Sequence, residues 1–180
     1  MVRSAPCPGR CLRATGLQAT RQALLQLPPQ RIDVLHVATH AQIDAQIPEL
    51  AALVLSRVDA AGCVQTASVR ARDVLAMRNM PPLVVLSACD AGAEPAGVAD
   101  GRMNLVKAFL ANGAREVVAS LWEAGDASTV ELMTHFYEGI VRDGLLPEAA
   151  LARAQASLAG SRRWSAPFYW AGFVVTLAEP

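Results

Sequence analysis

A cysteine and a histidine in this chain each follow a short apolar segment, and together they could form a nucleophile with an acid/base partner. Residues 83–86 are an unbroken apolar run typical of a strand buried on both faces, and Cys89 follows this run just before an Asp-Ala-Gly turn. Residues 32–39 are a second β-prone run, and His40 follows it directly. If the two strands are parallel neighbours, both residues emerge at one sheet edge, where chemistry collects in open α/β sheets. A thiol beside an imidazole is the minimal pair for nucleophilic catalysis.

Each of these residues also has a purely structural explanation. A cysteine after a strand is often a small buried hydrophobe, and a histidine at a strand end can be there for packing. His36 stands four residues before His40 among apolar neighbours, which favours a hydrogen-bonded core histidine. A metal site built from His36, His40 and Cys89 would need a helical His-x-x-x-His or four converging ligands, whereas the local pattern is β. We therefore expect no metal and no cofactor.

Composition and charge exclude several classes of partner. The chain has 180 residues, 53% of them hydrophobic, which is enough for one domain with a sizeable core. Sixteen basic and sixteen acidic residues balance, and the arginines are scattered, so neither nucleic acid nor an anionic membrane is expected as a partner. No apolar run approaches the roughly 20 residues that span a bilayer, and the N-terminus lacks the apolar segment of a secretory signal.

Cysteine usage favours a reducing, cytoplasmic environment. Four cysteines in a chain of this length do not make a disulfide framework. Cys7 and Cys11 have no further zinc ligands near them, so we expect this pair to be incidental.

Strand and helix patterns alternate along the chain, which predicts an α/β fold with a mostly parallel sheet covered by helices on both faces. Residues 1–14 are expected to be a disordered leader or a truncated boundary, and the domain is expected to occupy residues 15–180. The elements expected in between are a helix at 15–27, a hairpin of 52–58 and 63–67 around Gly62, a helix at 69–78 capped by Ser68, a helix capped by Asp100, a strand at 116–122, a helix capped by Asp126, a helix starting near Pro147 and a strand at 168–177.

Four sequence blocks resemble the CHAT domain family, a caspase-like module often found downstream of TPR repeats. They are His-Val-Ala-Thr-His at 36–40, Leu-Ser-Ala-Cys-Asp-Ala-Gly at 86–92, Ser-Leu-Trp at 120–122 followed by Asp126, and Phe-Tyr-Trp-Ala-Gly-Phe at 168–173. The resemblance runs from about residue 15 to about residue 178. It implies a caspase-like three-layer sandwich with a small hairpin insertion. It also implies a cysteine endopeptidase that cleaves protein or peptide substrates.

The resemblance assigns roles to individual residues. His40 would be the general acid/base and Cys89 the nucleophile, and the backbone N–H groups of Ala41 and Cys89 would bind the oxyanion. Ser87, Asp90 and Trp122 are candidates for a substrate pocket. Asp90 can equally be a turn residue, and Trp122 a core or rim aromatic.

Three departures from the family pattern leave a second reading open. Ala41 stands where the family usually has glycine, and a positive φ there would cost an alanine about 1 kcal/mol or more. Ala91 stands where a hydroxyl residue is common, and we expect the strands that normally precede the first helix to be lacking. The alternative is a catalytically silent binding or regulatory module, or a fragment of a larger TPR-containing protein, with a TPR-type region as partner.

Overall fold

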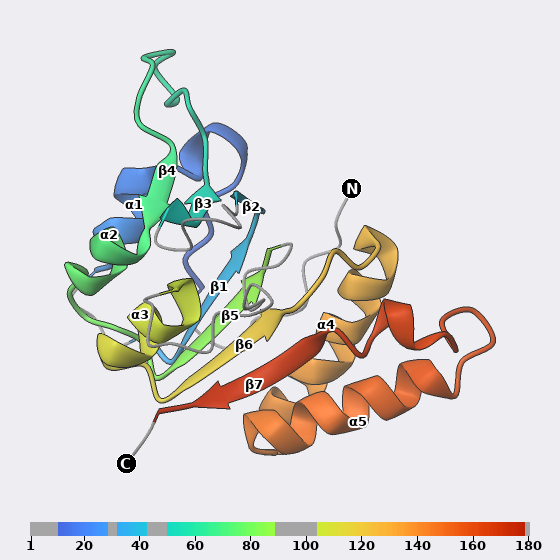
Figure 1. Ribbon diagram of the computed structural model, residues 1–180. Coiled ribbons are helices and arrows are strands. Elements are labelled where there is room, and N and C mark those ends of the chain that lie inside the picture. The colour runs from blue at the N-terminus through green and yellow to red at the C-terminus, as the bar shows by residue number, and fades with distance from the viewer. Residues whose placement is uncertain (1–10, 29–31, 43–49, 89–103, 179–180) are drawn as a thin grey trace. The chain divides into compact units, whose positions relative to one another are not determined.

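The computed structural model describes residues 11–28, 32–42, 50–88 and 104–178, which belong to two compact units (Figure 1). Residues 14–123 and 176–180 form one, here called the sheet unit. Residues 1–13 and 124–175 form the other, here called the helical unit. Each unit is described by itself below.

The central sheet has the strand order β1-β5-β6-β7. Its strands are β1 (Val34–Ala38), β5 (Leu83–Ser87), β6 (Glu116–Ser120) and β7 (Phe173–Leu177). β1, β5 and β6 are parallel neighbours. The N–H of Ala178 donates to the carbonyl of Arg115 at 2.9 Å, which places the end of β7 beside the start of β6. The predicted α/β class with a mainly parallel sheet is confirmed.

β5 is the strand that the apolar run at 83–86 predicted, and it is buried on both faces. Val84 and Leu86 point to one face, Val85 points to the other, and all three are fully buried. Burial of this kind contributes about 1.5–3 kcal/mol for each large aliphatic side chain. A strand without an exposed face needs the continuous apolar sequence that this one has.

Three short helices supply the core on one face of this sheet. They are α1 (Arg21–Leu25), α2 (Ala71–Leu75) and α3 (Leu105–Ala111), and a 3-10 turn, η1 (Gly16–Gln18), precedes them. Leu24, Val74 and Phe109 from these helices share one apolar cluster with Leu86 of the sheet. The helix predicted at 15–27 is therefore split into two short pieces.

Capping of α3 differs from the sequence-based expectation. The side chain of Asn104 accepts a hydrogen bond from the N–H of Lys107 at 2.8 Å, so Asn104 caps this helix. Asp100, the expected cap, lies outside the described residues. Gly113 has a φ of 105° just after the helix, as the Asn-Gly pair predicted.

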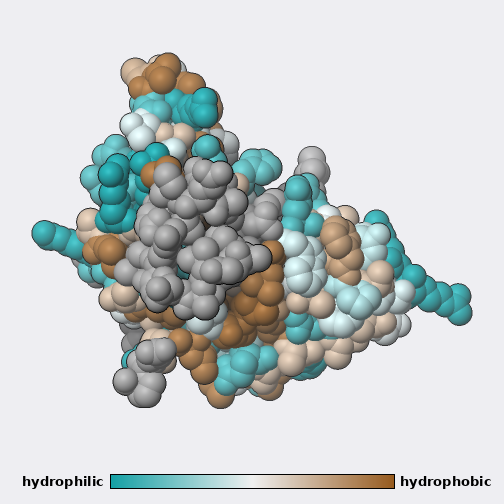
Figure 2. All heavy atoms as spheres, viewed as in Figure 1, coloured by the Kyte–Doolittle hydropathy of each residue, from teal (hydrophilic) through white to brown (hydrophobic). Residues whose placement is uncertain are grey.

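A second, antiparallel sheet contains the hairpin insertion. It consists of β2 (His40–Gln42), β3 (Ala52–Val54) and β4 (Ser68–Arg70). The hairpin and the positive φ of Gly62 (84°) are confirmed, but the returning strand is β4 and not residues 63–67. Ser68 pairs with Val54 and caps no helix, because α2 begins only at Ala71. The hairpin projects as an arm with apolar atoms at its tip, where Val64 is 85% exposed (Figure 2).

The helical unit is built on α4 (Asp126–Val141) and α5 (Pro147–Ala159). Gly139 allows the two helices to approach closely, because a Cβ at this position would lie 3.0 Å from the Cβ of Ala150. Pro147 opens α5 as predicted. Asp126 is the first residue of α4 and not its cap, which is Gly125. The strand expected at 168–177 begins only at Phe173, after the 3-10 turn η3 (Pro167–Tyr169).

Two cysteines can be described. Cys63 lies in the hairpin arm as an exposed free thiol. Cys11 is disulfide-bonded, so the expectation that it is incidental is wrong. Cys7 lies outside the described residues.

Candidate active site

The sheet brings the two predicted site positions to neighbouring strands. β1 and β5 pair in parallel, with Ala38 opposite Ser87 at their carboxyl ends. In the sequence His40 stands two residues beyond Ala38, and Cys89 stands two residues beyond Ser87. The parallel neighbourhood on which the prediction depended is therefore confirmed. Cys89 and Asp90 lie outside the described residues, so the pairing of the thiol with the imidazole stays a prediction.

His40 is placed by a change of sheet at the end of β1. β1 ends at Ala38, and His40 opens β2, where it pairs with Val54 of β3. The Thr39 hydroxyl donates a hydrogen bond to the carbonyl of Val54, which ties the connection to the hairpin. The side chain of His40 is exposed. This arrangement leaves His40 accessible to solvent.

Ala41 occupies ordinary extended backbone. It pairs with Leu53 in β2 and β3 and is partly buried against the main core. Among the described residues, Asn79 (φ 59°) is the non-glycine residue with a positive φ. The strain expected from alanine in place of glycine is therefore absent.

His36 and Ser87 form a hydrogen-bonded pair below this edge of the sheet. His36 Nε2 and Ser87 Oγ are 2.9 Å apart and join β1 to β5. Both residues lie on the sheet face opposite the core of α1, α2 and α3, because Val37 and Leu86 point into that core. The hydrogen bond predicted for His36 is confirmed, although the residue retains exposed surface and is not a core histidine.

The surroundings of His36 also affect its protonation. Burial desolvates the imidazole and lowers its pKa to about 4, although the residue as a whole retains exposed surface. His36 is therefore neutral at pH 7, with one ring nitrogen able to donate and the other to accept. His36 is in register with Val85, two residues before Ser87 on the same face of β5, so this pair can be recognised only once the register of the two strands is known.

Trp122 follows β6 by two residues and is half-buried. The hydroxyl of buried Ser120 donates to the carbonyl of Trp122 at 2.5 Å and so fixes the turn that leaves the strand. This turn holds the indole near a carboxyl end of the parallel sheet. Its place in a substrate pocket stays a prediction.

The described residues contain neither a metal-binding cluster nor a membrane-spanning helix. In those ranges no group of three or more His, Cys, Asp or Glu side chains is arranged to hold a metal ion. Of the helices described, none combines the length and the apolar character that crossing a bilayer requires.

Comparison with known proteins gives a family match over almost the whole chain. A family model described as "CHAT domain" matches residues 9–178. Tetratricopeptide repeat protein 28 from Mus musculus is 36% identical over 105 residues, and the protein of the same name from Homo sapiens is equally similar. Each alignment covers 58% of this chain and 4% of the relative. The chain thus corresponds to a small part of these relatives.

Proposed function

Because the chain belongs to the CHAT domain family, whose fold is caspase-like, we propose that it is a cysteine endopeptidase with Cys89 as nucleophile and His40 as general acid/base. One observation carries the proposal: the parallel register of β1 and β5, which ends with Ala38 opposite Ser87. The exposed imidazole of His40 adds support, because an acid/base partner has to be reached by substrate.

In the proposed reaction, His40 takes the proton of the Cys89 thiol, and the thiolate sulfur attacks the carbonyl carbon of the peptide bond. The carbonyl π electrons move to oxygen, and this oxyanion is stabilised by the backbone N–H groups of Ala41 and Cys89. The C–N bond then breaks as His40 returns the proton to the leaving nitrogen, which leaves a thioester. His40 then deprotonates a water molecule, whose oxygen attacks the thioester carbon; the C–S bond breaks to release the new carboxyl group, and His40 returns the proton to the sulfur of Cys89.

The proposed substrate is a protein or peptide segment whose side chains contact Ser87, Asp90 and Trp122. Ser87 already shares its hydroxyl with His36, so it offers a small, neutral surface and no charge. Trp122 can supply an apolar wall. We place the reaction in the cytoplasm, without a metal or other cofactor.

A second candidate function is a catalytically silent binding module. The small share of the tetratricopeptide repeat proteins that this chain matches favours it, whereas Ala41, which stands where the family usually has glycine, shows no backbone strain that would disable the site. In this case the fold would be kept for its contact with a TPR-type region.

Covalent trapping separates the two functions. The chain is incubated with peptide electrophiles that alkylate an attacking thiolate, and the labelled residue is identified by mass spectrometry. We expect labelling of the wild type and of Cys63→Ala, which removes a free thiol outside the site. We expect none at this site in Cys89→Ala and at least about tenfold slower labelling in His40→Ala.

The silent-module reading makes the opposite prediction. It predicts that peptide electrophiles label Cys63 and Cys89 at equally slow rates and that His40→Ala changes neither rate. That result would reject the peptidase.

A further inference from the structure

The loop that joins α5 to β7 (orange to red in Figure 1) carries a series of aromatic and cationic side chains in contact with one another. We call residues 161–170 the aromatic–arginine loop. The Arg163 guanidinium lies 4.4 Å from the ring centre of Trp164. The Trp164 and Tyr169 rings are 5.0 Å apart, and the Tyr169 and Phe168 rings are 5.5 Å apart, both pairs edge to face. All of these residues belong to the helical unit.

Polar contacts hold this series in place. The indole N–H of Trp164 donates to the Glu131 carboxylate at 2.7 Å, and the Trp164 backbone N–H donates to the Ser161 hydroxyl at 2.9 Å. The Gln155 amide donates to the carbonyl oxygens of Trp170 and Phe173 at 3.1 and 2.8 Å. Trp164 is only 9% exposed and anchors the loop. A surface that is already ordered loses little conformational entropy when a partner binds.

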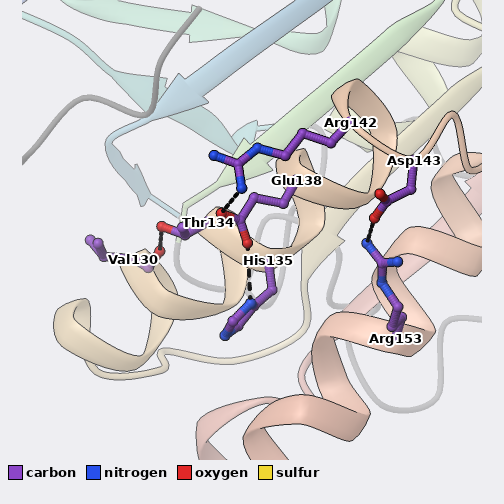
Figure 3. A network of polar contacts seen from close by, with 7 residues as sticks. All are labelled: Val130, Thr134, His135, Glu138, Arg142, Asp143 and Arg153. Carbon is purple, nitrogen blue, oxygen red and sulfur yellow. Dashed lines mark hydrogen bonds and ion pairs between the residues drawn. The ribbon is translucent and has the colours of Figure 1, made fainter.

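The arginines of this loop differ from those of the neighbouring helices. Arg142 pairs with Glu138 at 3.1 Å, and Arg153 pairs with Asp143 at 2.6 Å (Figure 3). These four residues, with His135 and Ser157, line a polar cleft in which each guanidinium is already neutralised by a carboxylate. Arg162 and Arg163 are exposed and make no ion pair with any residue in the described ranges.

An exposed aromatic ring ends the ring series. Phe168 is 54% exposed and is linked to Arg163 through the rings of Tyr169 and Trp164. Arginine, tyrosine and tryptophan are the residues that most often dominate binding energy at protein interfaces, and an exposed apolar side chain next to them supplies the contact that excludes water. Arginine also matches a carboxylate with two parallel N–H donors.

We propose that the aromatic–arginine loop is a docking surface for an acidic peptide segment that contains an aromatic or large aliphatic residue. Carboxylates of the segment pair with Arg162 and Arg163, and its apolar residue packs on Phe168. Two cations on a chain without net charge are too few for a nucleic acid or an anionic membrane, which need a broad basic surface. The proposal requires no catalytic role for Cys89.

The test measures binding of a labelled synthetic peptide in which phenylalanine is flanked by glutamates, with the full chain and by fluorescence anisotropy. We expect a Kd of about 10–100 μM, which weakens at least about tenfold in Arg162→Ala/Arg163→Ala, since a tenfold change corresponds to about 1.4 kcal/mol. Phe168→Ala should weaken binding about fivefold without changing the circular dichroism spectrum. The matched control is Arg142→Ala/Arg153→Ala, which removes the same charge from paired arginines and should leave Kd within twofold.

Further variants and ligands distinguish specific docking from simple charge attraction. Arg163→Lys keeps the charge but loses the planar fork and should weaken binding at least threefold. The same peptide with glutamines should not bind. Equal losses in the two double variants, equal binding of the glutamine peptide, or tighter binding of anionic phosphatidylserine vesicles or single-stranded RNA than of the acidic peptide would each overturn the proposal.

Discussion

The hydrogen bond between His36 and Ser87 should contribute measurably to stability beside the proposed catalytic edge. Its length of 2.9 Å and its position between two parallel strands are typical of a bond worth about 1 kcal/mol. Ser87→Ala and His36→Ala should therefore each lower the free energy of unfolding by about 1 kcal/mol at pH 7. The double variant should lose about 1 kcal/mol less than the sum of the single variants, because the two groups interact directly.

Lowering the pH should reduce the free energy of unfolding through the titration of His36. The pKa of His36 is about 4 in the folded chain and about 6.5 in the unfolded chain, so between these values the unfolded state binds the additional proton. This contribution to stability is full above about pH 6.5 and is lost as the pH falls toward 4. The full difference between the two pKa values would lower the free energy of unfolding by about 3 kcal/mol. Because the residue is partly open to solvent, which screens the effect, we expect a loss of about 1 kcal/mol.

Urea denaturation followed by circular dichroism and by tryptophan fluorescence, at about pH 7.5 and pH 4, measures both effects. His36→Gln can still hydrogen-bond but does not titrate, so it should lose about 1 kcal/mol less than the wild type over this pH range. The reasoning is refuted by a coupling energy below about 0.3 kcal/mol, or by parallel losses in the wild type and His36→Gln.

Three further predictions, two from substitutions and one from cleavage specificity, concern other parts of the chain. Asn104→Ala removes the cap that accepts the N–H of Lys107 and should cost about 1 kcal/mol, measured by urea denaturation, whereas Asn104→Asp should restore most of it. Gly139→Ala places a methyl group 3.0 Å from the Cβ of Ala150, so it should lower stability by about 1–3 kcal/mol, and an unchanged melting temperature would contradict the close packing of α4 on α5. Finally, the family resemblance points to relatives that cleave after arginine or lysine and carry an acidic residue two positions before the cysteine. This chain has Ser87 at that position, so a peptide library should show at most a weak preference for a basic residue before the cleaved bond. Strict cleavage after arginine or lysine would contradict this prediction.

The sequence predicted best those elements whose pattern is decided locally. The run at 83–86 is apolar at every position, and such a strand has to be buried on both faces, as β5 is. Pro147 likewise fixes the start of α5, because a residue without an N–H fits the first helical turn.

Elements decided by distant partners were predicted less well. Ser68 has the side chain of a helix cap, but its backbone pairs with Val54, fourteen residues earlier, and tertiary pairing overrode the local preference. His40 was expected at the end of the first strand, yet its own pairing with Val54 places it in a different sheet. The pair of His36 and Ser87 depends on the register between strands 51 residues apart, which no local pattern encodes.

The central claim is that Cys89 and His40 act as one unit, and alkylation kinetics test it most directly. Iodoacetamide is added near pH 6.5, where an ordinary thiol with a pKa of about 8.5 is only about one per cent ionised, and the modified residues are quantified by mass spectrometry over time. We predict that Cys89 reacts at least about tenfold faster than exposed Cys63, and that His40→Ala abolishes this advantage while the rate at Cys63 stays the same. Equal rates at both cysteines, or a fast Cys89 that is unaffected by His40→Ala, would contradict the claim.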